Sequence, residues 1–333
     1  MSWAERALTD VLDRVAATEP ELGGRWPLYA DPASGRWTTT ARGSWTGGFW
    51  AGLLWLRAAV TDDPADRSAA LARTELLAPW LEADTATRGL IFWYGTALGD
   101  GPATTLRTEA AKACLAAHDP ALGVVPWGGA FGGPRELVRV DGLPGLVPLL
   151  RQAGPDGIRA AEANVERYRE LAMTTSPPHP AWRALPGGTW TPHPEPPAGW
   201  SRTVGWLCLA TEDPRWLDQA AVAARFDPGA PAVPPADARR RDGPPDTSAA
   251  AIEAVAALKL AHRTGGGAAR VLRERGTAVL RALADGHLRE GRLLDGCYDL
   301  GHGVATRHEL VWGDFFLAVG LATLTGVLGP SDC

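Results

Sequence analysis

Helical periodicity is the feature that most constrains the fold of this chain. Apolar residues recur every three or four positions, whereas alternating runs of Val, Ile and Thr are short and rare. We expect twelve helices, at residues 2–18, 46–61, 66–83, 87–99, 103–118, 142–153, 157–175, 201–211, 214–226, 247–264, 267–289 and 310–326. Such a series suits either an α-solenoid or a closed ring of six helical hairpins. No exact repeat of about 30 to 45 residues is visible, which argues against a simple solenoid.

Composition excludes several classes of protein. A hydrophobic fraction of 45% with 21% charged residues is typical of a globular protein with a large core. The net charge of −5 and the scattered arginines give no basic footprint for nucleic acid or an anionic membrane surface. The acidic, amphipathic N-terminus does not resemble a secretory signal, and no apolar run is long enough for a membrane span. We expect a cytoplasmic protein that binds a small molecule, neither a nucleic acid nor a membrane.

The four cysteines, Cys114, Cys208, Cys297 and Cys333, lie far apart in the sequence and show no paired spacing. This pattern fits reduced thiols better than a disulfide framework or a zinc site. Neither metal-ligand spacing nor a phosphate-binding glycine motif is present, so we expect no metal and no cofactor. His179 and His193 are isolated in a proline-rich loop, and the sequence predicts that they face solvent.

Tryptophan is the one residue type out of proportion, with 15 Trp against 6 Phe and 4 Tyr. Indole rings stack on sugars and other ring-shaped ligands, so the excess favours a ring-binding pocket. A tryptophan-rich core explains the excess equally well.

Residues 138–150, VRVDGLPGLVPLL, place one acid, Asp141, before an apolar helix. One interpretation is a helix cap, because Asp accepts hydrogen bonds from the free amides of a first turn. The other is a general acid, because a carboxyl group shielded from water at the mouth of a buried helix can stay protonated near neutral pH. Asp84, before the apolar run at 89–94, has the same two interpretations, cap or pocket acid. Asp246 is expected to cap the helix that follows it.

Six segments, in this order, resemble the unsaturated glucuronyl hydrolases, which form glycoside hydrolase family 88, and more distantly family 105. The segments span nearly the whole chain and read SWTGGFW, RGLIFWY, LGVVPW with VDGLPGLVPLL, GWSRTVGW, DTSAAAIEAVAAL, and LLDGCYDLGHGV with ELVWGDFF. The resemblance implies an all-α fold, a single (α/α)6-barrel domain over residues 1–333, with its pocket at one end. The helix count points to the same ring of six hairpins.

The resemblance also implies a reaction. In this family a carboxylic acid protonates the C4=C5 enol ether of an unsaturated uronate, water adds at C5, and the hemiketal collapses to release the attached sugar. Asp141 falls where the family places its catalytic Asp, Trp45 and Trp50 fall on the aromatic wall, and Arg202 and Trp206 border the pocket. The candidate catalytic residues are therefore Asp141 and Asp84. The candidate substrate-binding residues are Trp45, Trp50, Thr87, Arg88, Trp127, Arg202, Trp206, His302 and Trp312.

The sequence departs from the family pattern at several pocket positions. The family's His-Asp pair reads Ala86 and Thr87, its Gln after the W-S-R-G segment reads Val204, a pocket His aligns near Thr191, and an Asp near the last helix reads Arg307. Losing several polar partners should remove preorganised stabilisation of a transition state. Three hypotheses remain open. They are a hydrolase of an unsaturated or modified sugar, a repurposed barrel enzyme such as a cyclase, dehydratase or isomerase of a secondary-metabolite pathway, and an inactive binding protein. The retained Asp141 and aromatic residues count against the third.

Overall fold

The computed structural model describes residues 1–172, 174–175, 178–194, 197–218, 220–237 and 239–333. Each of the twelve predicted segments contains helix. The α-helices are α1 (Trp3–Glu21), α2 (Gly47–Thr61), α3 (Pro64–Glu75), α4 (Tyr94–Thr96), α5 (Pro102–Ala116), α6 (Leu146–Gln152), α7 (Gly154–Ala172), α8 (Pro197–Thr211), α9 (Ala220–Phe226), α10 (Thr247–Arg263), α11 (Gly266–Gly286) and α12 (Val311–Thr325). Short 3-10 turns are η1 (Ser44–Thr46), η2 (Ala78–Glu82), η4 (Val140–Gly142) and η5 (Pro214–Asp218), and η3 (Gly89–Trp93) is a π-helix.

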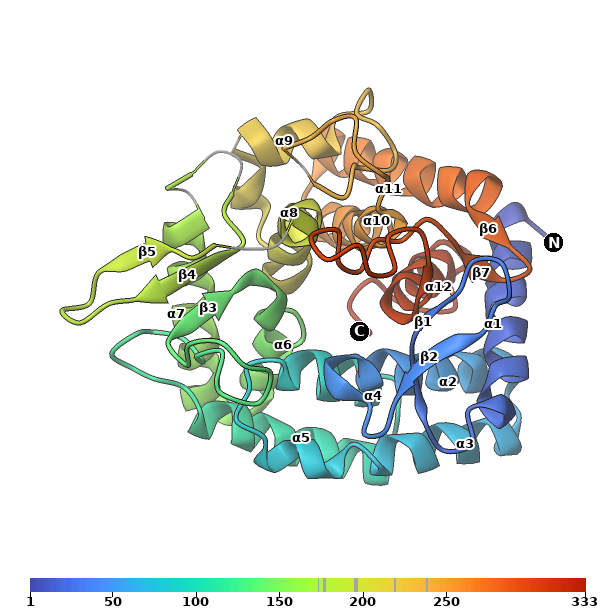
Figure 1. Cartoon of the computed structure of the whole chain (residues 1–333), viewed down its shortest axis with the longest axis horizontal. Helices are drawn as coiled ribbons and strands as arrows, with labels where there is room; N and C mark the ends of the chain where they lie inside the picture. The colour runs from blue at the N-terminus through green and yellow to red at the C-terminus, as the bar shows by residue number, and fades with distance from the viewer. Residues whose placement is uncertain (173, 176–177, 195–196, 219, 238) are drawn as a thin grey trace.

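The helices form two concentric rings, as Figure 1 shows, with α2, α4, α6, α8, α10 and α12 inside and α1, α3, α5, α7, α9 and α11 around them. The difference follows from the sequence pattern. The inner helix α12 is buried on all sides from residue 311 to 322, whereas the outer helix α1 buries one face at helical spacing. Helix α12 packs against α1 and α2, so the last hairpin closes on the first. The predicted all-α fold, an (α/α)6 barrel, is confirmed.

Short β-strands, which the sequence did not predict, occur in the loops between helices. They are β1 (Trp26–Ala30), β2 (Trp37–Thr40), β3 (Leu137–Arg139), β4 (Ala181–Ala184), β5 (Trp190–Pro192), β6 (Leu288–Arg289), β7 (Arg292–Leu293) and β8 (Glu309–Leu310). They pair antiparallel in the orders β2-β1-β8, β3-β4-β5 and β6-β7. Strands of two to five residues are too short to show a period of two.

Helix starts agree with the sequence in one case and correct it in another. Asp246 caps α10 as predicted, and its Oδ1 accepts hydrogen bonds from the amides of Ser248 and Ala249 at 3.1 and 3.3 Å. The helix predicted to start at 142 begins instead at Leu146, after a left-handed Gly145 with φ of 72°. Asp141 therefore does not cap it. Gly145 packs so closely on the Gly89 backbone that a Cβ atom there would collide with it.

None of the described helices is both long and apolar enough to cross a membrane. All four cysteines are buried as free thiols.

A buried charge cluster joins the first helix, α1, to the strands that precede the last helix, α12. Glu309 is completely buried and pairs with Arg14 of α1 at 3.2 Å and with Arg292 of β7 at 2.9 Å. Asp314, in the first turn of α12, accepts a hydrogen bond from the Leu293 amide at 3.1 Å. Burial, and then the charge of Glu309, raise the pKa of Asp314 well above its ordinary value.

This shift predicts a pH dependence of stability. Because the folded protein holds the Asp314 proton to a higher pH than the unfolded chain does, the contribution is fully present below the unfolded pKa of 3.8 and is lost as pH rises through the folded pKa. Asp314→Asn keeps an acceptor for Leu293 and removes the titration. Its free energy of unfolding, measured by urea denaturation from about pH 4 to 8, should rise relative to wild type as pH increases. A difference that stays constant with pH would contradict this account.

Candidate functional site

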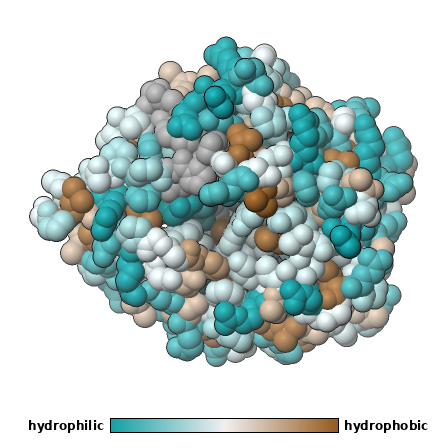
Figure 2. All heavy atoms as spheres, viewed as in Figure 1, coloured by the Kyte–Doolittle hydropathy of each residue, from teal (hydrophilic) through white to brown (hydrophobic). Residues whose placement is uncertain are grey.

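The loops at one end of the barrel enclose a cavity of about 490 Å³, which lies within the usual size range of small-molecule sites. The space-filling view shows this face hollowed near its centre (Figure 2). The aromatic residues of the lining are Trp45, Trp127, Phe131, Trp206 and Tyr298. Its titratable residues other than Tyr298 are Arg139, Asp141, His193, Arg202 and Asp299.

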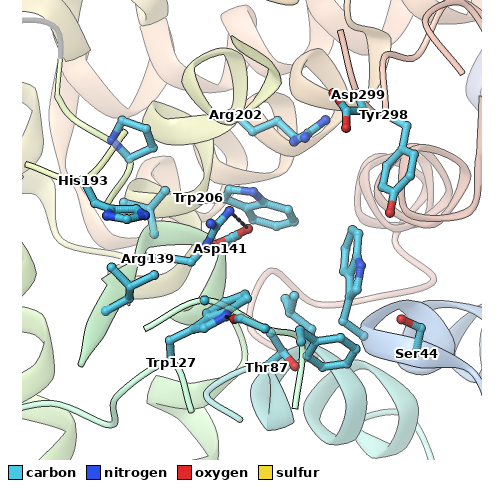
Figure 3. Close-up of a pocket in the computed structure, with 18 of the residues that line it drawn as sticks. Ser44, Thr87, Trp127, Arg139, Asp141, His193, Arg202, Trp206, Tyr298 and Asp299 are labelled. Atoms are coloured by element: carbon cyan, nitrogen blue, oxygen red, sulfur yellow. Dashed lines mark hydrogen bonds and ion pairs between the residues drawn. The ribbon is translucent and has the colours of Figure 1, made fainter. Parts of the chain in front are cut away.

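Asp141 lies on η4 and lines the cavity with a side chain that is 35% exposed. The Arg139 guanidinium donates two hydrogen bonds to the Asp141 carboxylate, from Nε to Oδ1 at 3.1 Å and from Nη2 to Oδ2 at 3.2 Å (Figure 3). A bidentate, charge-assisted pair of this kind fixes the orientation of the carboxylate in the cavity. The surroundings of Asp141 are therefore not only apolar, as the sequence suggested, but include the Arg139 guanidinium.

Backbone contacts fix the turn that presents this pair. The Tyr168 hydroxyl of α7 donates to the Arg139 carbonyl at 2.9 Å, and the Val140 amide donates to the Pro180 carbonyl at 2.9 Å. Behind the turn, Gly89 of the π-helix is in such close contact with the backbone of residues 144–146 that a Cβ atom would not fit. The close approach brings η3 against the start of α6, and both Thr87 and Asp141 line the cavity.

Aromatic rings form two walls of the cavity. Trp127 lies under the Arg139 guanidinium, 4.7 Å from ring centroid to Cζ, and its indole Nε1 donates to the Gly132 carbonyl at 3.1 Å. On the other side, Trp45 packs on the fully buried Trp312, with their ring centroids 5.0 Å apart. Flat indole faces held in this way can stack on a ring-shaped ligand.

Arg202 adds a second positive charge to the lining. Its Nη1 donates to Asp246 Oδ2 at 3.2 Å and to the Cys297 carbonyl at 2.8 Å. Asp246 is completely buried and also caps α10, so the cap anchors the guanidinium as well. Figure 3 shows Arg202 pointing into the cavity from α8, opposite Thr87 and Trp127.

The remaining rim carries Tyr298, Asp299 and His193. Burial raises the pKa of Tyr298. Burial alone would also raise the pKa of Asp299, but hydrogen bonds from the amide and ring of His302 outweigh it and lower that pKa. Burial, and then the charges of Arg139 and Arg183, lower the pKa of His193, which favours its neutral form. No cluster of three or more His, Cys, Asp or Glu side chains suited to a metal occurs within the described residues.

Six predicted site residues line the cavity: Asp141, Trp45, Thr87, Trp127, Arg202 and Trp206. Trp50 does not, and the prediction for it is corrected. Its ring is buried in the core, and its Nε1 donates to Glu19 of α1 at 2.7 Å. Trp312 is also corrected, since it supports Trp45 from behind instead of lining the cavity.

Three further predictions are corrected. Asp84 neither caps a helix nor reaches the cavity lining; its carboxylate binds the Gly129 amide at 2.7 Å and Arg135 at 2.6 Å, and so anchors the loop that carries Phe131. Arg88 is buried, with its Nε donating to the Leu81 carbonyl at 3.2 Å. His302 is 80% exposed and contacts the pocket residue Asp299 from outside, at 2.8 Å.

The sequence analysis missed Arg139, His193, Tyr298 and Asp299. Arg139 stands only two positions before Asp141, but the end of β3 and the turn η4 that bring the two side chains together could not be predicted from local patterning. His193 was predicted to face solvent, but it lines the cavity, because the β4–β5 hairpin folds back over the barrel end. His179 is also half-buried, with Nδ1 accepting from the Ala181 amide at 3.2 Å.

The two tryptophans of residues 44–50 give a matched test of the cavity. We expect Trp45→Ala to weaken the binding of a sugar ligand by roughly tenfold, since an aromatic contact contributes about 0.5 to 1.5 kcal/mol. Trp50→Phe, which alters a buried core ring, should lower thermal stability and leave affinity nearly unchanged. Titration calorimetry on both variants checks this. Equal losses of affinity in the two variants would contradict the assignment of Trp45 to the cavity and Trp50 to the core.

Comparison with known proteins identifies solved structures that have a similar fold. No protein-family model and no curated protein matches the chain. Among solved structures, the unsaturated glucuronyl hydrolase of Bacillus sp. GL1, responsible for the degradation of glycosaminoglycan, is 22% identical with a TM-score of 0.84, and the match covers 97% of each chain. One specific for heparin is 18% identical with a TM-score of 0.84, over 97% of this chain and 98% of that one. The enzyme of Streptococcus agalactiae is 16% identical with a TM-score of 0.80, over 97% and 92%.

The resemblance to this family is therefore confirmed for the fold.

Proposed function

We propose that this protein is an enzyme of the unsaturated glucuronyl hydrolase type, which acts on an unsaturated or modified uronic ring. The observation that carries the proposal is the Asp141 carboxylate, held by a rigid turn inside a cavity with indole walls. The fold shared with that family supports it. Two guanidinium groups, of Arg139 and Arg202, also line the cavity and suit the carboxylate of a uronate.

The reaction would proceed by hydration of the ring double bond. The carboxyl group of Asp141 gives its proton to C4, and the oxygen of a water molecule bonds to C5 as positive charge develops there. The Asp141 carboxylate takes the proton that this water releases, which restores the acid. The hemiketal at C5 then opens and releases the attached sugar, so one water is consumed for each bond cleaved.

A second candidate is a repurposed barrel enzyme, a cyclase, dehydratase or isomerase with Asp141 as proton donor. Thr87 favours it, because this residue lines the cavity where the resemblance places a second acid. Its hydroxyl pairs with that of Thr85 at 2.9 Å and cannot replace a titrating carboxyl group. Two other departures bear on it less directly, since Val204 and Thr191 lie outside the lining.

One assay separates the two candidates. An unsaturated glucuronyl disaccharide loses its ultraviolet absorbance when the C4=C5 bond is hydrated, so turnover is read directly. A kcat/KM above about 10⁴ M⁻¹s⁻¹ would support the hydrolase and oppose repurposing. No turnover, combined with tight binding of an apolar ring compound seen as Trp fluorescence quenching, would support the second candidate and sink the first.

A further inference from the structure

One carboxylate of the cavity lining has neither an arginine nor a lysine as its partner. Among the described residues, two carboxylates line the cavity, those of Asp141 and Asp299. Asp141 pairs with Arg139. Asp299 contacts the His302 ring at 2.8 Å, and it forms an ion pair with no arginine or lysine of the described residues. A carboxylate has about four acceptor positions, so Asp299 can also receive hydrogen bonds from a ligand.

A tight loop holds the Asp299 carboxylate in place. The backbones of Asp299 and Val304 exchange two hydrogen bonds, at 3.0 and 2.9 Å, and the His302 amide donates to Asp299 Oδ1 at 3.0 Å. Burial alone would raise the pKa of Asp299, but the hydrogen bonds from His302 outweigh it and lower that pKa, so the carboxylate is ionised near neutral pH. Its side chain is 27% exposed, so solvent screens the negative charge only in part.

Each arginine of the described lining has another carboxylate as a partner. Arg202 lies on the same side of the cavity as Asp299, as Figure 3 shows. Its guanidinium pairs, however, with the completely buried Asp246 at 3.2 Å. Arg139 pairs with Asp141. The part of the cavity at Asp299 therefore keeps a negative charge that attracts a cationic group of a ligand.

Aromatic rings adjoin Asp299 along the lining. Tyr298 precedes it in the chain, and Tyr298 and Trp45 both line the cavity. Both rings pack on Trp312, with centroid distances of 5.7 and 5.0 Å. An ammonium group is attracted both by a carboxylate and by the face of an aromatic ring. A neutral hydroxyl group gains less from the same surroundings, because its hydrogen bond to the carboxylate joins only one charged group.

We propose that the cavity binds an amino sugar, and that Asp299 selects this ligand by accepting hydrogen bonds from its ammonium group. The inference deepens the proposed function, and it rests on that function for the ligand being a sugar. An unsaturated uronate linked to an amino sugar satisfies both proposals. Its carboxylate suits the guanidinium groups of the lining, and its ammonium group suits Asp299.

Two amino sugars test the selection without turnover. Glucosamine and 6-amino-6-deoxyglucose carry the amine at different ring positions, and glucose has a hydroxyl group at both. Titration calorimetry at about pH 6, where both amines are protonated, measures the three affinities. We expect at least one amino sugar to bind wild type about tenfold or more tightly than glucose, because charge-assisted hydrogen bonds are the stronger ones. This ratio should fall as salt is raised from about 0.05 to 0.5 M, because salt screens the attraction.

Two asparagine variants locate the negative charge that is responsible. Asp299→Asn removes the charge and keeps an oxygen that can accept from His302. It should lower the affinity for the preferred amino sugar about tenfold, and leave glucose binding unchanged. Asp295→Asn is the matched control. Asp295 also contacts a histidine, His287, at 2.9 Å and is 29% exposed, but it lies outside the lining, so its variant should bind all three sugars like wild type.

Several results would overturn the selection. One is that glucose binds wild type as tightly as both amino sugars, including no measurable binding of any of the three. Another is a preference that persists in Asp299→Asn but disappears in Asp141→Asn, which would assign the ammonium group to Asp141. Equal losses in Asp299→Asn and Asp295→Asn would reduce the effect to the general charge of the loop.

The proposed function fails separately from this inference. A preference for an amino sugar that depends on Asp299, without turnover of the unsaturated glucuronyl disaccharide, would sink the hydrolase alone. Turnover of that disaccharide without any preference for an amino sugar would sink the selection alone.

Discussion

Asp141→Asn is expected to lower kcat on an unsaturated glucuronyl disaccharide by about a hundredfold or more, the usual range for removing a general acid. The asparagine keeps the shape of the side chain and an oxygen that can accept from Arg139, but it cannot carry the transferred proton. Because the substitution leaves the shape of the cavity unchanged, the loss should fall on kcat and not on KM. Decay of the C4=C5 absorbance under substrate saturation measures it.

A matched substitution controls for the loss of a carboxylate. Asp156 also pairs with an arginine, Arg159, but on the exposed surface of α7, away from the cavity lining. Asp156→Asn should therefore turn over like wild type. Turnover by Asp141→Asn within about threefold of wild type would remove general acid catalysis by this residue, given the much larger factor expected.

Glu309→Gln is expected to destabilise the fold by about 3 kcal/mol or more, the cost typical of removing one partner from a buried ion pair. Arg14 and Arg292 then stay buried around a neutral amide. Arg14 lies on the first helix, α1, and Arg292 lies on the β6–β7 hairpin, which precedes the last helix, α12. Part of the loss should be offset, because the pKa of Asp314 is raised partly by Glu309, and Asp314 can ionise more readily once that charge is gone. Urea denaturation at neutral pH gives the free energy of unfolding.

An exposed ion pair serves as the comparison. Arg270 and Glu274 form an i,i+4 pair on α11 with side chains 70% and 60% exposed. Glu274→Gln should cost no more than about 0.5 kcal/mol, because solvent already screens that pair. Similar losses in both variants would mean that the Glu309 cluster contributes no more than a surface contact.

The region around Asp141 shows how much of the site could be predicted from the sequence. The run of apolar residues after Asp141 correctly predicted a buried helix next to a polar turn, and the order of the family-like segments placed that turn at the barrel end. The same residues predicted two alternative roles for the Asp141 carboxyl group, helix cap or general acid. Neither prediction included Arg139 as its partner. Arg139 was missed because strand and turn geometry decide the partner of a charged group, and local apolar patterning does not encode that geometry.

The tryptophans show the same division. Trp45 and Trp50 share one motif and a similar composition of neighbours, yet one lines the cavity and the other donates to Glu19 inside the core. Asp84 and Arg88 were predicted as site residues because they precede an apolar run, but the loop of residues 128–135 binds the Asp84 carboxylate and the Leu81 carbonyl accepts from Arg88. His193 was predicted to face solvent. It lines the cavity because it follows the β4–β5 hairpin, whose strands were too short to predict.

The sequence by itself determined the ring of helices, because helical periodicity and the burial it demands are local and repeat twelve times along the chain. It also determined the cap at Asp246 and the segments that reach the pocket end. Only the tertiary structure decided which polar groups face one another, including the fork of Arg139 on Asp141 and the burial of Glu309 between Arg14 and Arg292. Those pairings join residues of separate elements, and their energies depend on distances and burial that exist only once the barrel has closed.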